Sequence, residues 1–253
     1  MSGQEIDWLL KEKYHGEKTP AFYNDCKRLA KGEPLAYLIG WVPFLNCKIY
    51  LDHKPLIPRP ETEYWTKEAI TAIKHKFSTT LDNSPASPKI LDLCAGSGCI
   101  GVAVAKAIPE ARVDFVEIDA KLIPTIKKNL ETNRIEDKRT KIIHSNLFSN
   151  ITESYDFILS NPPYLAAYST RVQDSVTKYE PYVALFAGTD GLDVIRDIIA
   201  ASPFHLSSGG ELWLEHDPEQ TDVINKLARE NNFFVSTHQD QYKVERYSTL
   251  VLK

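Results

Sequence analysis

A polar corner follows an apolar run in the second half of the chain: Asn161-Pro162-Pro163-Tyr164 comes directly after Phe-Ile-Leu-Ser at residues 157–160. Proline fixes φ and lacks an N–H, so the carbonyls of this segment stay available as acceptors. The Asn161 amide adds another acceptor and the Tyr164 ring adds a flat wall. We expect this acceptor corner, residues 161–164, to hold a planar NH2 group. For the tetrapeptide alone, a proline turn that caps a buried strand is the alternative.

A glycine-rich turn follows an earlier predicted strand. Gly96, Gly98 and Gly101 have the Gly-x-Gly-x-x-Gly spacing, and Glu117 follows about twenty residues later, where an acid can accept from ribose hydroxyls. By itself the pattern fits a dinucleotide or an adenosyl cofactor, because a helix N-terminus favours a carboxylate and a phosphate equally. Asp92 and the acceptor corner suit a cofactor with a cationic methyl donor and an amino group. The residues therefore favour S-adenosylmethionine over NAD.

Strands and helices alternate around these motifs. Apolar runs predict strands at residues 89–93, 112–117, 141–144, 155–160, 210–215, 233–237 and 246–252. Helical patterns lie between the first three of them, and a further helix is expected at residues 192–200. This rhythm predicts an α/β fold with a mostly parallel sheet wrapped by helices. The long connection at residues 165–188 shows no periodicity and is expected to form a lid or a docking loop.

The N-terminal part is expected to be a short helical and hairpin region. Helices are predicted from the spacing of Ile6, Leu9, Leu10 and Tyr14 and at residues 21–31, a hairpin at 41–51, and another helix from near Glu61. A polar, proline-containing segment then separates this part from the alternating elements. We therefore predict a docking region at residues 1–77, a linker at 78–88 and a catalytic, cofactor-binding domain at 89–253.

Composition narrows the classes of protein. The chain has 253 residues, 43% of them hydrophobic, and a net charge of −4, which gives no general attraction to nucleic acid. No apolar run approaches the roughly 20 residues that span a bilayer. The acidic start of the chain is unlike a signal or transit peptide, so a cytoplasmic protein is expected, with a mitochondrial one open for a trimmed chain. No metal site is expected, because four cysteines lack zinc-like spacing: Cys26, Cys47, Cys94 and Cys99.

The chain resembles the class I methyltransferases that modify the glutamine of the Gly-Gly-Gln tripeptide in peptide-chain release factors. Beyond the glycine turn and the acceptor corner, the matching segments, in the family's order, are residues 32–40, 58–63, 180–181 with 184–185, 190–192 and 209–211. The acceptor corner is shared with methyltransferases of nucleic-acid amines. The Pro-Arg-Pro-Glu-Thr-Glu segment at residues 58–63, ahead of the glycine turn, is much more specific to this family.

The resemblance implies a Rossmann-like domain with a seven-stranded sheet, and it implies roles for single residues. The residues expected to hold S-adenosylmethionine are Asp92, Cys94, Ala95, Gly96, Ser97, Gly98, Glu117, Asn146, Leu147 and Asn161. Asn161 Oδ1 and the Pro162 carbonyl would accept the two N–H bonds of the target glutamine, and Tyr164 would pack against its amide. These three are the expected catalytic residues, and Pro163 joins them in binding substrate.

The implied reaction is N5-methylation of that glutamine in a release factor, without a membrane and without sequence-specific binding of nucleic acid. The chain departs from the family in two places. Cys94-Ala95 replaces the usual Gly-Thr, and Asn146 replaces the usual Asp, so the adenine amine would meet an amide oxygen instead of a carboxylate. Arg59 is expected near the site. Glu180 either braces the 165–188 connection over the site or is a solvated surface acid.

Other functions remain open from the residues alone. A methyltransferase of adenine N6 or guanine N2 would use the same corner with the base stacked on Tyr164, but the basic groove or recognition domain that it needs is not visible. A nicotinamide-dependent protein would use the glycine turn and leave the acceptor corner unexplained. A protein that binds the cofactor without methyl transfer is a third possibility.

Overall fold

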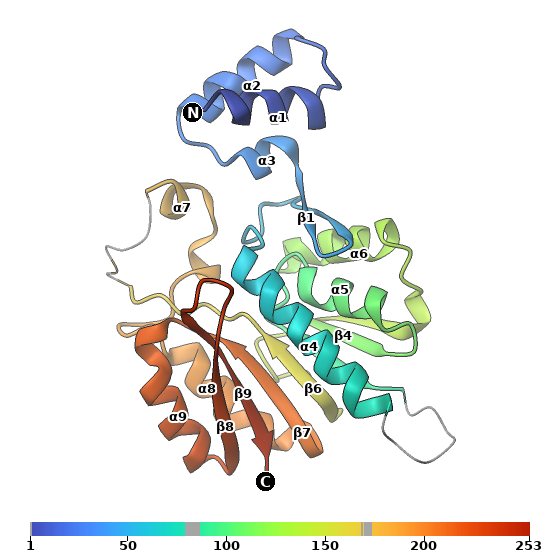
Figure 1. Cartoon of the computed structure of the whole chain (residues 1–253), viewed down its shortest axis with the longest axis vertical. Helices are drawn as coiled ribbons and strands as arrows, with labels where there is room; N and C mark the ends of the chain where they lie inside the picture. Colours follow the sequence, from blue (N-terminus) through green and yellow to red (C-terminus); the bar gives the residue numbers. More distant parts are fainter. Residues whose placement is uncertain (1, 79–86, 168, 170–173) are drawn as a thin grey trace.

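A seven-stranded sheet forms the centre of the computed structural model, which describes residues 2–78, 87–167, 169 and 174–253 (Figure 1). The strand order is β5-β4-β3-β6-β7-β9-β8, and β9 runs antiparallel to both of its neighbours while the other pairs are parallel. The strands are β3 (Lys89–Leu93), β4 (Arg112–Glu117), β5 (Thr140–His144), β6 (Tyr155–Ser160), β7 (Leu206–Glu215), β8 (Phe233–Gln239) and β9 (Glu245–Leu252). The predicted mostly parallel α/β sheet is confirmed.

Helices cover both faces of this sheet. The helices α4 (Pro60–Ser78), α5 (Cys99–Ala107) and α6 (Ile123–Thr132) pack on one face, and α8 (Asp193–Ala201) and α9 (Thr221–Glu230) pack on the other. Successive residues of a strand point to opposite faces. Ile90 of β3 accordingly joins the first hydrophobic cluster, and Leu91 and Leu93 join the second.

Helix α4 lies along one face of the sheet and is tied to β7 near both of its ends (Figure 1). Its apolar stripe, Trp65, Ala69 and Ile73, recurs every four residues and is fully buried. Lys76 Nζ lies 3.1 Å from Glu211 Oε1, and at the opposite end Trp65 Nε1 donates to Glu215 Oε2 at 2.7 Å. The first turn of α4 is therefore held over the carboxyl ends of β6 and β7.

A small helical unit precedes the sheet and stands away from it (Figure 1). It consists of α1 (Gly3–Glu12), α2 (Pro20–Ala30) and α3 (Leu35–Ile39) around its own core of Leu9, Phe22, Leu29 and Leu38. Strands β1 (Trp41–Phe44) and β2 (Cys47–Tyr50) form the predicted hairpin, which leads to α4. Helix α1 ends before Tyr14, whose hydroxyl instead donates to Asp25 Oδ2 at 2.7 Å.

Three segments differ from the sequence prediction or lie partly outside the described residues. Strand β7 begins at Leu206 rather than at residue 210, because its pairing with β6 continues across a register shift between Tyr155 and Phe157. Residues 79–86 of the predicted linker lie outside the described residues, so the domain boundaries stay a prediction. Residues 165–188, of which 168 and 170–173 lie outside the described residues, contain α7 (Asp174–Tyr179) and an isolated bridge between Leu165 and Phe186, and their expected role as a lid or docking loop stays a prediction. Among the helices described, none is long and apolar enough to cross a membrane.

Candidate active site

The carboxyl ends of the central strands open into a cavity of about 340 Å³. It lies where the strand order reverses, with β4 on one side of β3 and β6 on the other, which is the usual place for ligands in an open α/β sheet. The sequence-predicted residues that line it are Cys94, Gly96, Glu117, Asn146, Leu147, Asn161 and Pro163. The structure therefore brings most of the predicted cofactor residues and part of the acceptor corner to one cavity.

The glycine turn is tight and contains residues with left-handed backbone, and each of its three glycines is needed for a different structural reason. Gly96 has a φ of 56°, and a Cβ placed there would meet no described atom within 4 Å. Gly98, with a φ of 77°, is the left-handed residue immediately before helix α5. A Cβ on Gly101 would come within 2.3 Å of Phe115, so this glycine allows α5 to pack on the sheet. Cys94 has a φ of 64°, a conformation that glycine adopts without strain.

Glu117 is a buried acid whose two oxygens are held by backbone N–H groups. Gly96 donates to Oε2 at 2.7 Å and Asp119 donates to Oε1 at 2.8 Å. Burial raises the pKa of Glu117, and these backbone donors act in the opposite direction. Each carboxylate oxygen can accept more than one hydrogen bond, so the side chain retains acceptor capacity toward the cavity that it lines.

Four predicted cofactor residues lie behind the cavity wall. Asp92, Ala95, Ser97 and Gly98 are buried and are not among the residues that line it. Asp92 Oδ2 accepts from the Gly101 N–H at 2.8 Å, while Oδ1 has no hydrogen-bond partner in the described part of the chain. Burial raises the pKa of Asp92 to about 8. These residues shape the turn from below, and their contact with a cofactor stays a prediction.

The acceptor corner leaves β6 at Asn161. The Asn161 Nδ2 donates to Thr62 Oγ1 at 3.1 Å, and Asn161 Oδ1 is buried without a hydrogen-bond partner among the described residues. We call this oxygen the open acceptor. A buried polar atom in this state is rare in folded proteins and indicates a ligand, a water or an ion that would complete it.

Tyr164 points away from the cavity lining. Its hydroxyl donates to Glu215 Oε1 at 3.2 Å. Burial raises the pKa of the Tyr164 hydroxyl above its ordinary value. Pro162 is buried and Pro163 lines the cavity. Tyr164, which is predicted to pack against a substrate amide, is hydrogen-bonded to Glu215 in this structure. Its catalytic role stays a prediction.

Two segments that are distant in sequence meet at one side of the cavity, and we call them its roof. The Glu180 carboxylate accepts from Ile57 N at 2.9 Å and pairs with Arg59 at 2.5 Å. Its side chain is only 1% exposed, so it is a buried brace and not a solvated surface acid. The ion pair joins the 58–63 and 180–181 segments. Leu56, just before the first segment, and Pro181, within the second, line the cavity.

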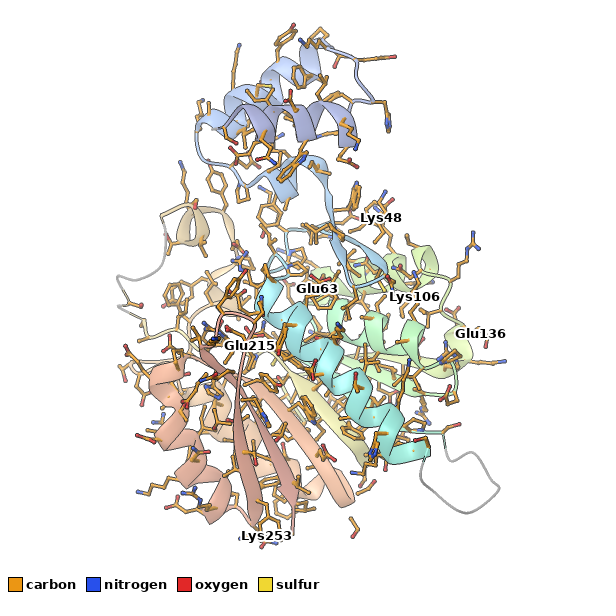
Figure 2. The ribbon with its side chains drawn as sticks, viewed as in Figure 1. Lys48, Glu63, Lys106, Glu136, Glu215 and Lys253 are labelled. Carbon is orange, nitrogen blue, oxygen red and sulfur yellow. The ribbon has the colours of Figure 1, made fainter. Side chains whose placement is uncertain are left out.

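Sequence reasoning missed two residues beneath the acceptor corner. The sequence pattern places Thr62 within the 58–63 segment and Glu215 at the end of a predicted strand, and it indicates no contact between them. Thr62 Oγ1 donates to Glu215 Oε2 at 2.7 Å. Glu215, which Figure 2 labels, is 1% exposed. A signal existed, because an acid that closes the apolar run Leu212-Trp213-Leu214 needs a partner if the strand is central. Among the described residues, no group of three or more His, Cys, Asp or Glu could hold a metal ion.

The sheet order, the glycine turn, the acid after the second strand and the corner after the fourth define a class I methyltransferase. Residues 74–178 match the model of the family described as Methyltransferase small domain. The catalytic domain of hMettl16, solved in complex with MAT2A 3'UTR hairpin 6, aligns with a TM-score of 0.60 and 17% identity over 82% of this chain and 75% of that one. This likeness concerns the fold.

Sequence relatives give the family. The release factor glutamine methyltransferase of Rhodopirellula baltica is 34% identical over 88% of this chain and 74% of its own length. The protein of that name from Lactococcus lactis is 34% identical over 96% of this chain and 87% of its own length. The chain belongs to the family of release factor glutamine methyltransferases.

Proposed function

We propose that this protein transfers a methyl group from S-adenosylmethionine to the side-chain nitrogen of the glutamine in the Gly-Gly-Gln motif of a peptide-chain release factor. The observation that carries the proposal is the open acceptor, Asn161 Oδ1, beside the cavity that the glycine turn and Glu117 also line. A buried oxygen of this kind suits an N–H donor. Family membership names the donor as a glutamine amide.

The cavity fits the proposed cofactor. Gly96 lines the cavity without a side chain, so a cofactor can approach its backbone closely. The Glu117 carboxylate can accept hydrogen bonds from the two hydroxyls of a ribose. Leu147 and Ile118 offer apolar surface to the adenine ring, and the Asn146 side-chain oxygen can accept from its amine. The cofactor supplies an electrophilic methyl group on a sulfonium. The chain's own task is to bind it and to orient the nucleophile.

Orientation is the main catalytic device that we propose. An amide nitrogen is a weak nucleophile because its lone pair is delocalised into the carbonyl. Asn161 Oδ1 and the Pro162 carbonyl would accept its two N–H bonds and hold the nitrogen in line with the methyl group. Once it has gained the methyl group the nitrogen is positively charged and strongly acidic, so it can lose its proton to solvent water without a strong base in the chain. Tyr164, bonded to Glu215, would support the corner from below.

The partner in this proposal is the release factor itself. Its glutamine would reach the corner beneath the roof that Arg59 and Glu180 hold together. Tyr182 and Val183, which follow Pro181, are exposed apolar residues that a protein substrate could cover, and Val183 also lines the cavity. We place the reaction in the cytoplasm, where translation terminates.

Methyl transfer from radiolabelled S-adenosylmethionine tests the proposal. The substrates are a purified release factor, the same factor with Gln→Ala in its Gly-Gly-Gln motif, and a nucleic-acid control that contains adenine and guanine. We expect label on the native factor alone. Label on the nucleic acid would assign the alternative activity, and equal label on both forms of the factor would exclude the proposed glutamine.

A further inference from the structure

Glu215 is a buried carboxylate that collects three hydrogen bonds at the end of β7. Thr62 and Trp65 donate to Oε2, both at 2.7 Å, and Tyr164 donates to Oε1 at 3.2 Å. An indole N–H can only donate, and an ionised carboxylate can only accept. Burial raises the pKa of Glu215, while these donors and the charge of Arg246 favour its ionised form.

The position of Glu215 follows from the fold. Residues 211, 213 and 215 of β7 alternate toward the face that α4 covers, and Thr62 and Trp65 lie one turn apart on α4. Asn161 leaves the neighbouring strand β6, whose last residue Ser160 pairs with Leu214. Figure 2 shows Glu215 beside the first turn of α4. Three elements thus meet at a single carboxylate.

The hydroxyl of Thr62 has one proton, which it donates in its hydrogen bond to Glu215. Thr62 Oγ1 therefore turns a lone pair toward Asn161, which lies 3.1 Å away. A lone pair requires a donor, so the nitrogen end of the Asn161 amide must face Thr62. The oxygen end is left as the open acceptor. The reverse orientation would place two acceptors in contact, with no proton between them.

We propose that Thr62 and Glu215 are positioning residues that fix which end of the Asn161 amide is offered to the substrate. The inference rests on the proposed role of Asn161 as an acceptor for the glutamine amide. A turned-over side chain would present its own NH2 to the NH2 of the substrate, donor against donor. The buried pair therefore selects an amine or amide nitrogen and rejects a carbonyl at this position.

Three substitutions on α4 test this role through kinetics. Thr62→Val keeps the shape and removes the hydroxyl, and Thr62→Ser keeps the hydroxyl. Thr66→Val makes the same change one turn further along, where the hydroxyl donates to the Thr62 carbonyl at 2.7 Å. We expect Thr62→Val to lower kcat/KM for the release factor on the order of 10- to 100-fold, because the competent orientation becomes a minor one. Thr62→Ser and Thr66→Val should stay within about threefold of the native chain.

Cofactor affinity separates positioning from general damage. Calorimetric titration with S-adenosylmethionine should give the same dissociation constant, within about twofold, for the native chain and Thr62→Val. In Glu215→Gln the glutamine oxygen can still accept from Thr62 and Trp65, so kcat/KM should remain above that of Thr62→Val. Native kcat/KM in folded Thr62→Val, or a loss in Thr62→Ser equal to that in Thr62→Val, would overturn the inference.

A spectroscopic readout needs no turnover, and Asn161→Asp serves only to assign the signal. The side-chain NH2 of Asn161, assigned by its disappearance from the ¹⁵N–¹H spectrum of Asn161→Asp, should show one proton that exchanges slowly with solvent because Thr62 holds it. Fast exchange of both protons in the native chain would contradict the inference. A slow proton in a chain that methylates no release factor would keep the orientation and reject the proposed function, so the two failures are distinguishable.

Discussion

The two halves of the cavity wall are built in different ways. In the cofactor half, backbone groups meet side chains near in sequence: the Gly96 N–H reaches Glu117 across 21 positions and the Gly101 N–H reaches Asp92 across 9. In the acceptor half, side chains meet across long separations: Asn161 reaches Thr62 across 99 positions and Thr62 reaches Glu215 across 153. Binding of the cofactor should therefore depend on local backbone shape, and orientation of the substrate on a buried side-chain network.

Asn161→Ala gives the largest expected effect and should separate the two halves. Methyl transfer should fall on the order of 10²- to 10³-fold, because the variant removes the acceptor that orients the nucleophile. The affinity for S-adenosylmethionine should change by less than about tenfold, since Gly96 and Glu117 are untouched. Single-turnover kinetics and calorimetry measure the two quantities. Equal losses in both would show that the halves are not separable.

Glu117→Gln should have the opposite effect, lowering the affinity for S-adenosylmethionine and leaving the rate at saturating cofactor unchanged. Both oxygens of Glu117 accept a backbone N–H, so a glutamine NH2 must face one of those donors. We expect S-adenosylmethionine to bind on the order of 10- to 100-fold more weakly, because the NH2 replaces an oxygen that would accept from a ribose hydroxyl, a loss of about 1–3 kcal/mol. At saturating cofactor the rate should recover. A lower rate that saturation does not restore would place Glu117 in the acceptor half.

Asp92→Asn probes the buried base of the cofactor half through pH. The folded-state pKa of Asp92 is raised to about 8, so its contribution to stability is fully present below the unfolded value near 4 and is lost as pH rises toward 8. The asparagine cannot ionise. Between pH 5 and 8 we expect the native chain without cofactor to lose at least about 1.4 kcal/mol more stability than Asp92→Asn, which is the equivalent of one pKa unit.

Denaturant titration at several pH values measures this difference. Parallel stability curves for the two proteins would mean that Asp92 is ionised in the fold at neutral pH. The buried carboxylate would then need a partner that the described hydrogen bonds do not supply.

Cys94→Gly gives the smallest expected effect. Cys94 has a left-handed φ of 64°, and a side chain costs about 1 kcal/mol there relative to glycine. The substitution should raise the thermal midpoint by about 2–4 °C and leave cofactor affinity equal or higher. Burial raises the pKa of the Cys94 thiol to about 12, so loss of a reactive thiolate should not complicate the result. A lower midpoint would mean that the packing of the sulfur outweighs the strain.

The same contrast explains what could be predicted from sequence. The ranges 89–93, 112–117 and 155–160 coincide with β3, β4 and β6, because these strands are apolar runs bounded by polar or turn residues. The glycine turn and Glu117 were found by spacing, since the cofactor half is local. Helix α9 was not anticipated, although Ile224 and Ala228 recur on its buried side.

The acceptor half was predicted only in part. Asn161 could be found because its neighbours in sequence are prolines. Thr62 and Glu215 could not be paired, because nothing in either segment states that α4 crosses the end of β7. The bond between Arg59 and Glu180 was missed for the same reason. Contacts between distant elements follow from topology, and residue spacing does not encode them.

The most direct test of the central claim locates the methyl group. A release factor treated with the native protein and S-adenosylmethionine is digested, and the peptide that contains Gly-Gly-Gln is sequenced by tandem mass spectrometry. Our account predicts one added methyl group, on the side-chain nitrogen of that glutamine, and a far smaller modified fraction after the same time with Asn161→Ala. A methyl group on any other residue, or an equal modified fraction with Asn161→Ala in that time, would contradict it.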